Sequence, residues 1–372
     1  MRISGTRSSA VCFLLLTFLA PIASSAQAKW KGTVVKEGDV TVVKNPKEPI
    51  YKSPIIEFKE DLSLGGPDAR GDYAFGQVQT FIVDDSGSIY VLDKKNYNLK
   101  VFDSSGSYLR TIGRKGQGPG ELEYPYMLSL NQTSGELVVH ELGHGISYFD
   151  TDGTFLRHLS LKTMLSLRGL VDAKGDIYIM EYIRNEKGAH YETKKLASDG
   201  SVIAVIAESP AWVVSNPDPF MATSYFVVDR ANNLVFGYPL TYEIRFYGPS
   251  DTKVFKRITR EYDRVAVKAE EREEQEKSVP PGTTIGFEFP KYHSAYRRFF
   301  TSDLGHLFVE TWETTKGGKK VHDIFDAEGH LIGCMSLKPS GIAILKGKYY
   351  ALEEDEDGFQ YVKRYAVTWK VK

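Results

Sequence analysis

Residues 87–106 read Gly-Ser-Ile-Tyr-Val-Leu-Asp-Lys-Lys-Asn-Tyr-Asn-Leu-Lys-Val-Phe-Asp-Ser-Ser-Gly, and residues 135–153 follow the same pattern as Gly-Glu-Leu-Val-Val-His-Glu-Leu-Gly-His-Gly-Ile-Ser-Tyr-Phe-Asp-Thr-Asp-Gly. A looser third copy ends at Gly200, which lies 47 residues after Gly153, just as Gly153 lies 47 residues after Gly106. In each copy, alternating apolar residues predict half-buried strands, and Asp-x-x-Gly elements predict tight turns between them. Four strands in about 40–50 residues is the length of one blade of a β-propeller.

Three less regular units follow the third copy and bring the number of units to six. In each unit one residue precedes a β-rich run and is expected to form the turn between the first and second strands. These six residues are Gly87, Gly135, Gly175, Asn232, Gly305 and Gly347. The sequence therefore predicts an all-β fold, a six-bladed β-propeller of four-stranded antiparallel blades.

The sixth unit contains only three of the four strands that a blade needs. The sixth unit ends two or three residues after its third strand, so another segment must supply the outer strand, or an edge is left open. We expect an N-terminal strand to close this blade, and residues 32–35 and 40–43 are the candidates.

A charged insertion at about residues 263–280 separates the fourth unit from the fifth. Residues 265–278 read Val-Ala-Val-Lys-Ala-Glu-Glu-Arg-Glu-Glu-Gln-Glu-Lys-Ser, in which strong helix formers dominate, and Pro-Pro-Gly at 280–282 ends the run. One short helix between blades four and five is therefore expected. The alternative is a disordered acidic loop, because the charges would lie on all sides of such a helix.

The first 28 residues have the features of a cleaved secretory signal. Arg2 and Arg7 precede an apolar run at residues 10–20, and Ala26-Gln27-Ala28 supplies the small residues that a signal peptidase requires. The apolar run is shorter than a membrane span, although an uncleaved anchor is the alternative. We expect residues 29–372 to form a single propeller domain, periplasmic or secreted, with no transmembrane segment in the mature chain.

Charge and composition exclude two classes of protein. The 372 residues carry 47 Lys and Arg against 48 Asp and Glu, so there is no basic excess to meet the phosphate backbone of a nucleic acid. An aromatic content of 12% is not that of a disordered chain. Of the two cysteines, Cys12 lies in the signal, and Cys334 stands in an apolar run that favours a buried thiol over a nucleophile.

Residues 116–122 read Gly-Gln-Gly-Pro-Gly-Glu-Leu and are soon followed by Pro125. Together with the strands on either side, this segment resembles the NHL-repeat family of six-bladed β-propellers. Over roughly residues 50–370, the chain is similar to exported bacterial six-bladed propeller proteins, many of which have no assigned activity. The resemblance implies the fold predicted above and does not by itself imply a function.

A zinc-protease motif occurs in the second copy, where residues 140–144 read His-Glu-Leu-Gly-His. In such enzymes both histidines bind zinc from one face of a helix, and the glutamate polarises the bound water. The repeat instead predicts that His140 and Glu141 end a strand and that His144 lies in the next loop, so a protease is disfavoured. The three residues remain candidates for binding a metal or anion on the face that carries the connections between blades, which we call the loop face. The alternative is an exposed loop that binds nothing.

The face that carries the connections between blades is where propellers usually bind small molecules. Charged and aromatic residues that could recognise a sugar or a peptide on that face are Arg114, Arg184, Tyr238, Tyr242 and Trp312. The alternative for the aromatic residues is packing between blades. No Ser/His/Asp arrangement beyond what the repeat explains is recognisable in the sequence.

These observations favour an exported, non-catalytic recognition module, a monomer that binds a protein, peptide or carbohydrate on its loop face. No cofactor is indicated, although a divalent metal is compatible with the sequence. The alternative is a metal-dependent propeller hydrolase or lyase of the lactonase type, with its metal held in the central channel by several blades. Three convergent acidic, Asn or His groups in the channel would favour the enzyme, and an apolar or blocked channel would favour the binding module.

Overall fold

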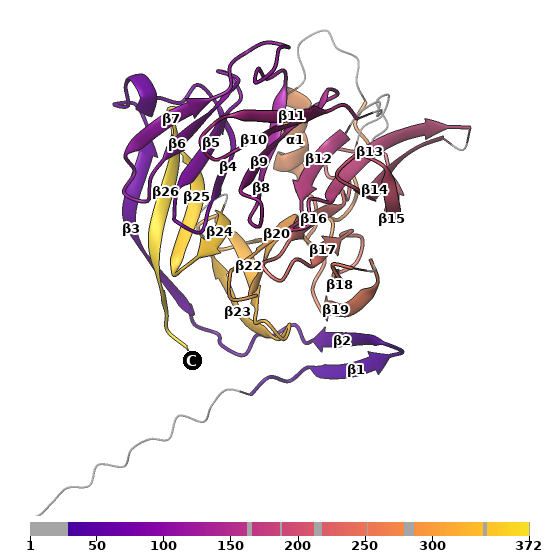
Figure 1. The fold of residues 1–372 in the computed structure, drawn as a ribbon. Helices are drawn as coiled ribbons and strands as arrows, with labels where there is room; N and C mark the ends of the chain where they lie inside the picture. The colour runs from indigo at the N-terminus through magenta and orange to yellow at the C-terminus, as the bar shows by residue number, and fades with distance from the viewer. Residues whose placement is uncertain are drawn as a thin grey trace, which may run out of the picture.

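The computed structural model describes residues 29–161, 166–186, 188–211, 218–250, 252–278, 286–337 and 341–371. The expected signal at residues 1–28 and the Pro-Pro-Gly at 280–282 lie outside these residues. The described chain forms six sheets whose first strands surround a common channel (Figure 1). The predicted six-bladed propeller of four-stranded antiparallel blades is confirmed. No helix in this part of the chain is long and apolar enough to cross a membrane.

The first three blades are each formed by consecutive strands, which run in order from the innermost strand outward. Blade one contains β4 (Val78–Val83), β5 (Ile89–Asp93), β6 (Asn98–Phe102) and β7 (Tyr108–Ile112). Blade two contains β8 (Pro125–Asn131), β9 (Glu136–Glu141), β10 (Gly145–Phe149) and β11 (Phe155–Leu159). Blade three contains β12 (Ser166–Val171), β13 (Ile177–Asn185), β14 (Gly188–Leu196) and β15 (Val202–Pro210).

The last three blades use strands from both ends of the chain. Blade four contains β16 (Tyr225–Val228), β17 (Leu234–Gly237), β18 (Glu243–Tyr247) and β19 (Val254–Arg260). Blade five contains β20 (Arg298–Thr301), β21 (Leu307–Thr314), β22 (Lys320–Phe325) and β23 (Leu331–Ser336). Blade six contains β24 (Gly341–Leu345), β25 (Lys348–Glu354), β26 (Gln360–Trp369) and the N-terminal β3 (Ile56–Gly65).

All six predicted turn residues lie between the first and second strands of their blades. The five glycines have φ between +70° and +86°, a conformation that glycine adopts without strain. Asn232 has φ +65°, and asparagine is one of the few other residues that tolerates this region. The repeat therefore located equivalent positions correctly even in its less regular units.

The strand that closes the ring is β3, which differs from the expectation that residues 32–35 or 40–43 would do so. β3 pairs antiparallel with β26 along its whole length, from Ile56 opposite Trp369 to Gly65 opposite Tyr361. The two expected segments form a separate hairpin, β1 (Thr33–Glu37) and β2 (Val40–Asn45), and β2 pairs in parallel with β19. They therefore widen blade four to six strands instead of completing blade six.

The N-terminal segment thus spans three blades in succession (Figure 1). After β2 covers blade four, the Asn45 side chain donates to Thr259 O of blade four and to Gly329 O beside blade five, at 3.1 and 2.9 Å. Ile50 N then donates to Leu331 O of blade five at 3.0 Å, and β3 continues onto blade six. Hydrogen bonds from one segment consequently hold the outer strands of three neighbouring blades together.

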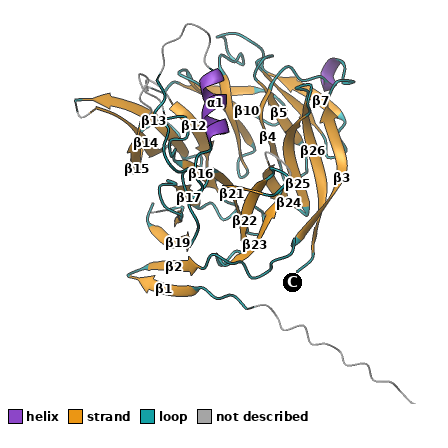
Figure 2. Ribbon diagram, turned by 180° about the vertical axis from the view of Figure 1, so that it is seen from behind, coloured by secondary structure: helices purple, strands orange, loops and turns teal. Residues whose placement is uncertain are grey.

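The charged insertion contains the helix α1 (Ala269–Lys277), so the helical expectation is confirmed over the disordered loop. Strands make up most of the described structure, and α1 stands out among them (Figure 2). None of the helix residues is buried. The helix is held at its start by Glu271, whose carboxylate accepts from Lys268 N at 2.9 Å and lies 3.0 Å from His293 Nε2.

Candidate functional site

The first strands of all six blades line a central channel with a cavity volume of about 710 Å³. One end of the channel lies among the turns between first and second strands and includes Asp85 and Arg230. The other end lies at the start of the first strands, toward the face that carries the connections between blades. Arg168, Tyr225 and Arg298 line the channel at that end.

These three residues occupy the same position on three neighbouring blades. Arg168 on β12, Tyr225 on β16 and Arg298 on β20 each precede the turn residue of their blade by seven residues. Equivalent positions on neighbouring blades lie at the same depth in the channel, since the blades are related by rotation about it. The fold therefore places a tyrosine between two arginines at one level of the channel.

The guanidinium of Arg168 is held in place by an aromatic ring and a backbone carbonyl. Its central carbon lies 3.8 Å from the centroid of the Tyr225 ring, and its Nε donates to Phe226 O at 3.2 Å. A β-bulge between Ser166 and Arg168 shifts the register of β12, and such bulges redirect side chains. Arg168 makes no ion pair with any described residue, so its positive charge is compensated only by the ring and the carbonyl.

Arg298 belongs to a charged group in blade five that is centred on Glu310. Arg298 Nε donates to Glu310 Oε2 at 2.8 Å, and Arg297 pairs with the other oxygen of the same carboxylate. Burial would raise the pKa of Glu310, but the two arginines outweigh it and the pKa is lowered. Burial lowers the pKa of the neighbouring His322 to about 4, so this imidazole is neutral at pH 7. Two arginines therefore share one carboxylate.

A second hollow of about 500 Å³ adjoins the channel between blades four and five. Tyr225 and Arg298 line both cavities, and the second is completed by Met221, Thr223, Pro239, Ser294, Tyr296, Arg297 and Trp312. The Trp312 ring stacks on His293 with centroids 3.9 Å apart, and its Nε1 donates to Ser294 Oγ at 3.1 Å. An aromatic wall next to hydroxyl and guanidinium groups is suited to a polar organic ligand.

The structure places the five expected loop-face residues in different surroundings. Trp312 lines the second hollow, whereas Tyr238 is partly buried in the core between blades three and four. Arg114 is exposed on the connection between blades one and two and pairs with Glu121 at 2.9 Å. Arg184 is exposed near the tip of the β13–β14 hairpin, which projects away from the ring (Figure 1). These residues do not form one surface.

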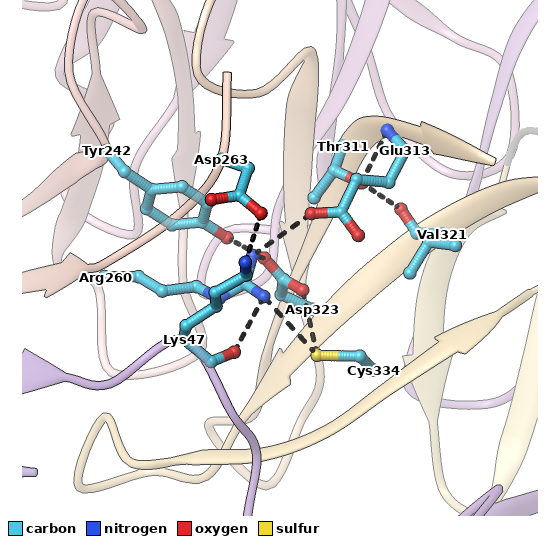
Figure 3. Close-up of polar contacts among 9 residues, drawn as sticks. All are labelled: Lys47, Tyr242, Arg260, Asp263, Thr311, Glu313, Val321, Asp323 and Cys334. Carbon is cyan, nitrogen blue, oxygen red and sulfur yellow. Dashed lines mark hydrogen bonds and ion pairs between the residues drawn. The ribbon is translucent and has the colours of Figure 1, made fainter. Parts of the chain in front are cut away.

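Tyr242 is buried in a polar network between blades four and five (Figure 3). Its hydroxyl donates to Asp323 Oδ2 at 2.5 Å, and the same oxygen accepts from Arg260 Nη1 at 2.7 Å. Arg260 Nη2 donates to Lys47 O at 3.1 Å, and the Cys334 thiol donates to Asp323 Oδ1 at 3.1 Å. Burial and the Asp323 carboxylate raise the pKa of Cys334, which disfavours the thiolate. The network therefore joins two blades and leaves Tyr242 no access to a ligand.

The His-Glu-Leu-Gly-His segment is a strand end and a turn, as the repeat predicted. His140 and Glu141 are the last residues of β9, and β10 begins at Gly145. His140 is buried, and neither of its ring nitrogens has a hydrogen-bond partner among the residues that the structure describes. Burial lowers its pKa to about 4, so this imidazole is neutral at pH 7 and is enclosed instead of lying on the loop face. His144 follows the strand, with Nδ1 3.3 Å from Glu123 Oε2.

Glu141 stabilises the connection between blades one and two. Its carboxylate accepts from Glu123 N at 2.5 Å and from the Ser147 hydroxyl at 2.6 Å. His158 Nδ1 lies 3.0 Å from that hydroxyl, so the structure forms a Ser/His/Glu group that the sequence did not reveal. Ser147 is buried and its proton points to the carboxylate, an arrangement that does not provide an activated nucleophile.

One group in the described part of the chain has a spacing compatible with a metal. The ligand atoms of His190, Glu192 and Glu208 lie within 4.8 Å of one another on β14 and β15, the outer strands of blade three. Lys194 Nζ lies 2.8 Å from Glu192 Oε2, so a cation would compete there with a bound ammonium. The group is on the outside of a blade, away from the channel.

Sequence reasoning missed Arg168, Tyr225 and Arg298, the residues that the fold brings together. A signal was present, because each stands seven residues before a correctly identified turn residue. The copies are recognisable from their turns onward, whereas their first strands have little sequence in common. If the alignment of the units is extended from the turn residues toward the N-terminus, Arg168, Tyr225 and Arg298 fall at the same position of the repeat.

Comparison with known proteins supports the propeller. The DUF5128 family model, described as a 6-bladed beta-propeller, matches residues 68–276. A Bacteroides fragilis protein, provisionally described as exported, has a solved structure with a TM-score of 0.57 at 14% identity, covering 88% of this chain and 99% of that one. At that identity the likeness concerns the fold alone.

Two animal proteins share a stretch of 110 residues with this chain. The identity is 28% to Protein brain tumor of Drosophila melanogaster and 35% to the B-box type zinc finger protein ncl-1 of Caenorhabditis elegans. The stretch covers 29% of this chain but only 11% and 13% of those proteins. This chain therefore spans about a tenth of the length of these relatives.

Proposed function

The chain belongs to the DUF5128 family of six-bladed β-propellers, and on that premise we propose that it is a non-catalytic recognition module. The observation that carries this proposal is the pair of adjoining hollows that share Tyr225 and Arg298. Together they offer a concave site with an aromatic wall, hydroxyl groups and arginines, which is the composition of a binding site for a polar ligand.

The alternative, a metal-dependent hydrolase or lyase, calls for convergent carboxylate, Asn or His ligands in the channel. The described residues place arginines at the loop-face end of the channel, and Glu310 is already occupied by two of them. Cations at that position repel a divalent metal. Asp85, Asp229 and Asp303 line the other end, but among the described His, Cys, Asp and Glu residues the group with metal-ligand spacing lies on β14 and β15, outside the channel. This supports binding over metal-dependent catalysis.

Residues 1–28 are proposed to be a signal that is removed on export, which would deliver the propeller to the periplasm or the cell exterior as a monomer. Support comes from the basic residues, the short apolar run and the Ala-Gln-Ala ending. Intact-mass measurement of the exported protein should give a chain that begins at Lys29. A mass that includes residues 1–28 would contradict this part of the proposal.

Ligand binding can be followed through the fluorescence of Trp312, because this ring lines the second hollow. A panel of neutral sugars, acidic sugars and short peptides should include a class that changes the emission and raises the unfolding temperature. The variant Trp312→Phe should lose the change in emission. The control Tyr124→Ala, which removes an exposed aromatic from another connection between blades, should keep it.

Two results would decide against the recognition module. One is a complete lack of response to the panel. The other is hydrolysis of a lactone that requires added divalent metal and disappears with a chelator, which would support the enzyme instead.

A further inference from the structure

We infer that the site binds an organic carboxylate, seated at the loop-face end of the channel between Arg168 and Arg298 with the Tyr225 ring between them. This inference rests on the proposed function, since it names the chemical class of the ligand for the same site. It is carried by the geometry of three side chains and by the balance of charge around them.

The orientation of the Arg168 guanidinium is fixed, and its two terminal nitrogens remain available to a ligand. Nε is used by Phe226 O, and the face of the guanidinium rests on the Tyr225 ring, so its plane is set before a ligand arrives. The two terminal nitrogens make no hydrogen bond with the described residues. Terminal nitrogens held in one plane match the two oxygens of a carboxylate, and such paired hydrogen bonds are stronger than single ones.

Positive charge is in excess at this end of the channel. Arg168, Arg297 and Arg298 contribute three charges, Glu310 compensates one, and His322 contributes none at pH 7 because its pKa is about 4. The carboxylates that line the opposite end have partners there: Asp85 pairs with Arg230, and Asp229 and Asp303 accept from Asn233 N and Lys346 N. The positive excess is therefore local to the loop-face end, and a local excess of one sign attracts the oppositely charged group of a ligand to that end.

The adjoining hollow indicates that the anion belongs to an organic molecule. Trp312, Thr223 and Ser294 line that hollow, while Arg298 and Tyr225 connect it to the channel. A free inorganic anion would fill only the space between the arginines and would leave the adjoining hollow beside Trp312 unfilled. A carboxylate attached to a polar body would occupy both hollows.

The proposal can be tested with four probes at low ionic strength: glucuronate, succinate, glucose and inorganic phosphate. Glucuronate and succinate both carry a carboxylate but differ in the rest of the molecule. Glucose is the neutral counterpart of glucuronate, and phosphate is an anion without an organic group. Glucuronate and succinate should raise the unfolding temperature of the wild-type protein, and added salt should weaken the effect. Glucose should not raise it, and phosphate should do so less than either carboxylate.

Variants of Arg168 test the residue directly. Arg168→Gln should weaken the apparent affinity for the carboxylates at least tenfold, and Arg168→Lys should also weaken it because an ammonium lacks the planar pair of donors. Arg114→Gln, which removes an exposed arginine on another connection, should leave the affinity unchanged. Each variant is compared with its own unfolding temperature without ligand, and Arg168→Lys serves if the glutamine variant does not fold.

Carboxylate binding that is unaffected by either Arg168 variant would overturn the inference, as would stabilisation by phosphate equal to that by glucuronate. A neutral ligand that binds at Trp312 while both carboxylates fail would overturn the inference and leave the proposed function standing. Failure of the four probes and of the wider panel would overturn both.

Discussion

Arg230 and Asp85 lie on opposite blades and meet across the channel, with Arg230 Nη1 2.7 Å from Asp85 Oδ1. Arg230 follows the first strand of blade four and Asp85 follows that of blade one, and both line the central cavity at the turn side. Lys346 of blade six also donates to the Asp85 carbonyl. The contact spans the end of the channel opposite Arg168, so a ligand is expected to enter from the loop face.

Replacing this ion pair should change stability little. Its side chains are 34% and 59% exposed, and exposed pairs contribute roughly 0–1 kcal/mol. Arg230→Ala should therefore lower the free energy of unfolding, measured in urea, by less than about 1 kcal/mol. The reference is Lys277→Ala, which removes another exposed pair with Glu273 on α1. A loss several times that of the reference would mean that the pair holds the ring together.

Asp323 should be far more costly to replace. It is buried between Arg260 and the Tyr242 hydroxyl, and its removal leaves the buried Arg260 with the more distant and partly exposed Glu313 carboxylate, 3.9 Å away, as its ionic partner among the described residues. Asp323→Ala should lower the free energy of unfolding by about 3–5 kcal/mol. Asp263→Ala removes an exposed partner of Lys47 in the same region and should cost less than about 1 kcal/mol. Equal losses in the two variants would contradict the structural role of the network.

Cys334 should resist thiol reagents in the folded protein. Burial raises its pKa, and the charge of Asp323 adds to the effect, so little thiolate forms at neutral pH. In protein that begins at Lys29, labelling should occur at the rate of unfolding, which is measured by adding a chromogenic disulfide over a range of urea concentrations. Rapid labelling without denaturant would show that the thiol is accessible and ionised.

His140 should make stability dependent on pH. Its pKa is lowered from 6.5 to about 4 by burial, so between these values the unfolded chain binds a proton that the folded chain does not. Stability is therefore retained above pH 6.5 and lost as the pH falls toward 4, by up to roughly 3 kcal/mol for this group.

The variant His140→Leu tests this effect, because Leu92 occupies the equivalent place in blade one and is also buried. Urea unfolding at a series of pH values should show a smaller loss of stability on acidification than in the wild type. His322 has a similarly low pKa and should account for part of the loss that remains. Identical pH profiles for variant and wild type would rule out His140 as a source.

The His-Glu-Leu-Gly-His segment should not support zinc-dependent proteolysis. His140 is enclosed in the interior, Glu141 is bound to a backbone amide and a serine, and His144 lies beyond the strand. These three side chains do not present a shared site to zinc and water. His144→Ala should match the parent in zinc content and in peptide hydrolysis. Stoichiometric zinc in the parent that disappears from the variant, with loss of hydrolysis, would make this segment an active site.

The repeat was readable from the sequence because the turns between first and second strands have a strict backbone requirement. A residue with positive φ is needed at each, which restricts the choice to glycine or, at Asn232, asparagine. The same regularity placed His140 in a strand, although it belongs to a five-residue motif that is typical of a helix. Local conformational constraints leave a record in the sequence, and the blades could be counted from it.

The closing strand and the channel residues could not be located in this way. Residues 32–35 and 40–43 have more β-branched residues than β3, whose sequence Ile-Glu-Phe-Lys-Glu-Asp-Leu-Ser-Leu-Gly is partly charged because much of it is exposed. Which strand pairs with β26 depends on contacts between the two ends of the chain. Arg168 and Arg298 likewise meet at one level only after three blades have been stacked, and local patterns do not report such convergence.

The pairing of β3 with β26 also orders the events of biosynthesis. β3 ends at residue 65, and the strand that it pairs with begins at residue 360, so most of the chain is made between the two partners. Contacts of such long sequence separation form late and slow the overall rate of folding. Until residues 360–369 have been made, β3 remains an unpaired strand that could associate with other chains. A chaperone that covers β3 during this period would prevent such association.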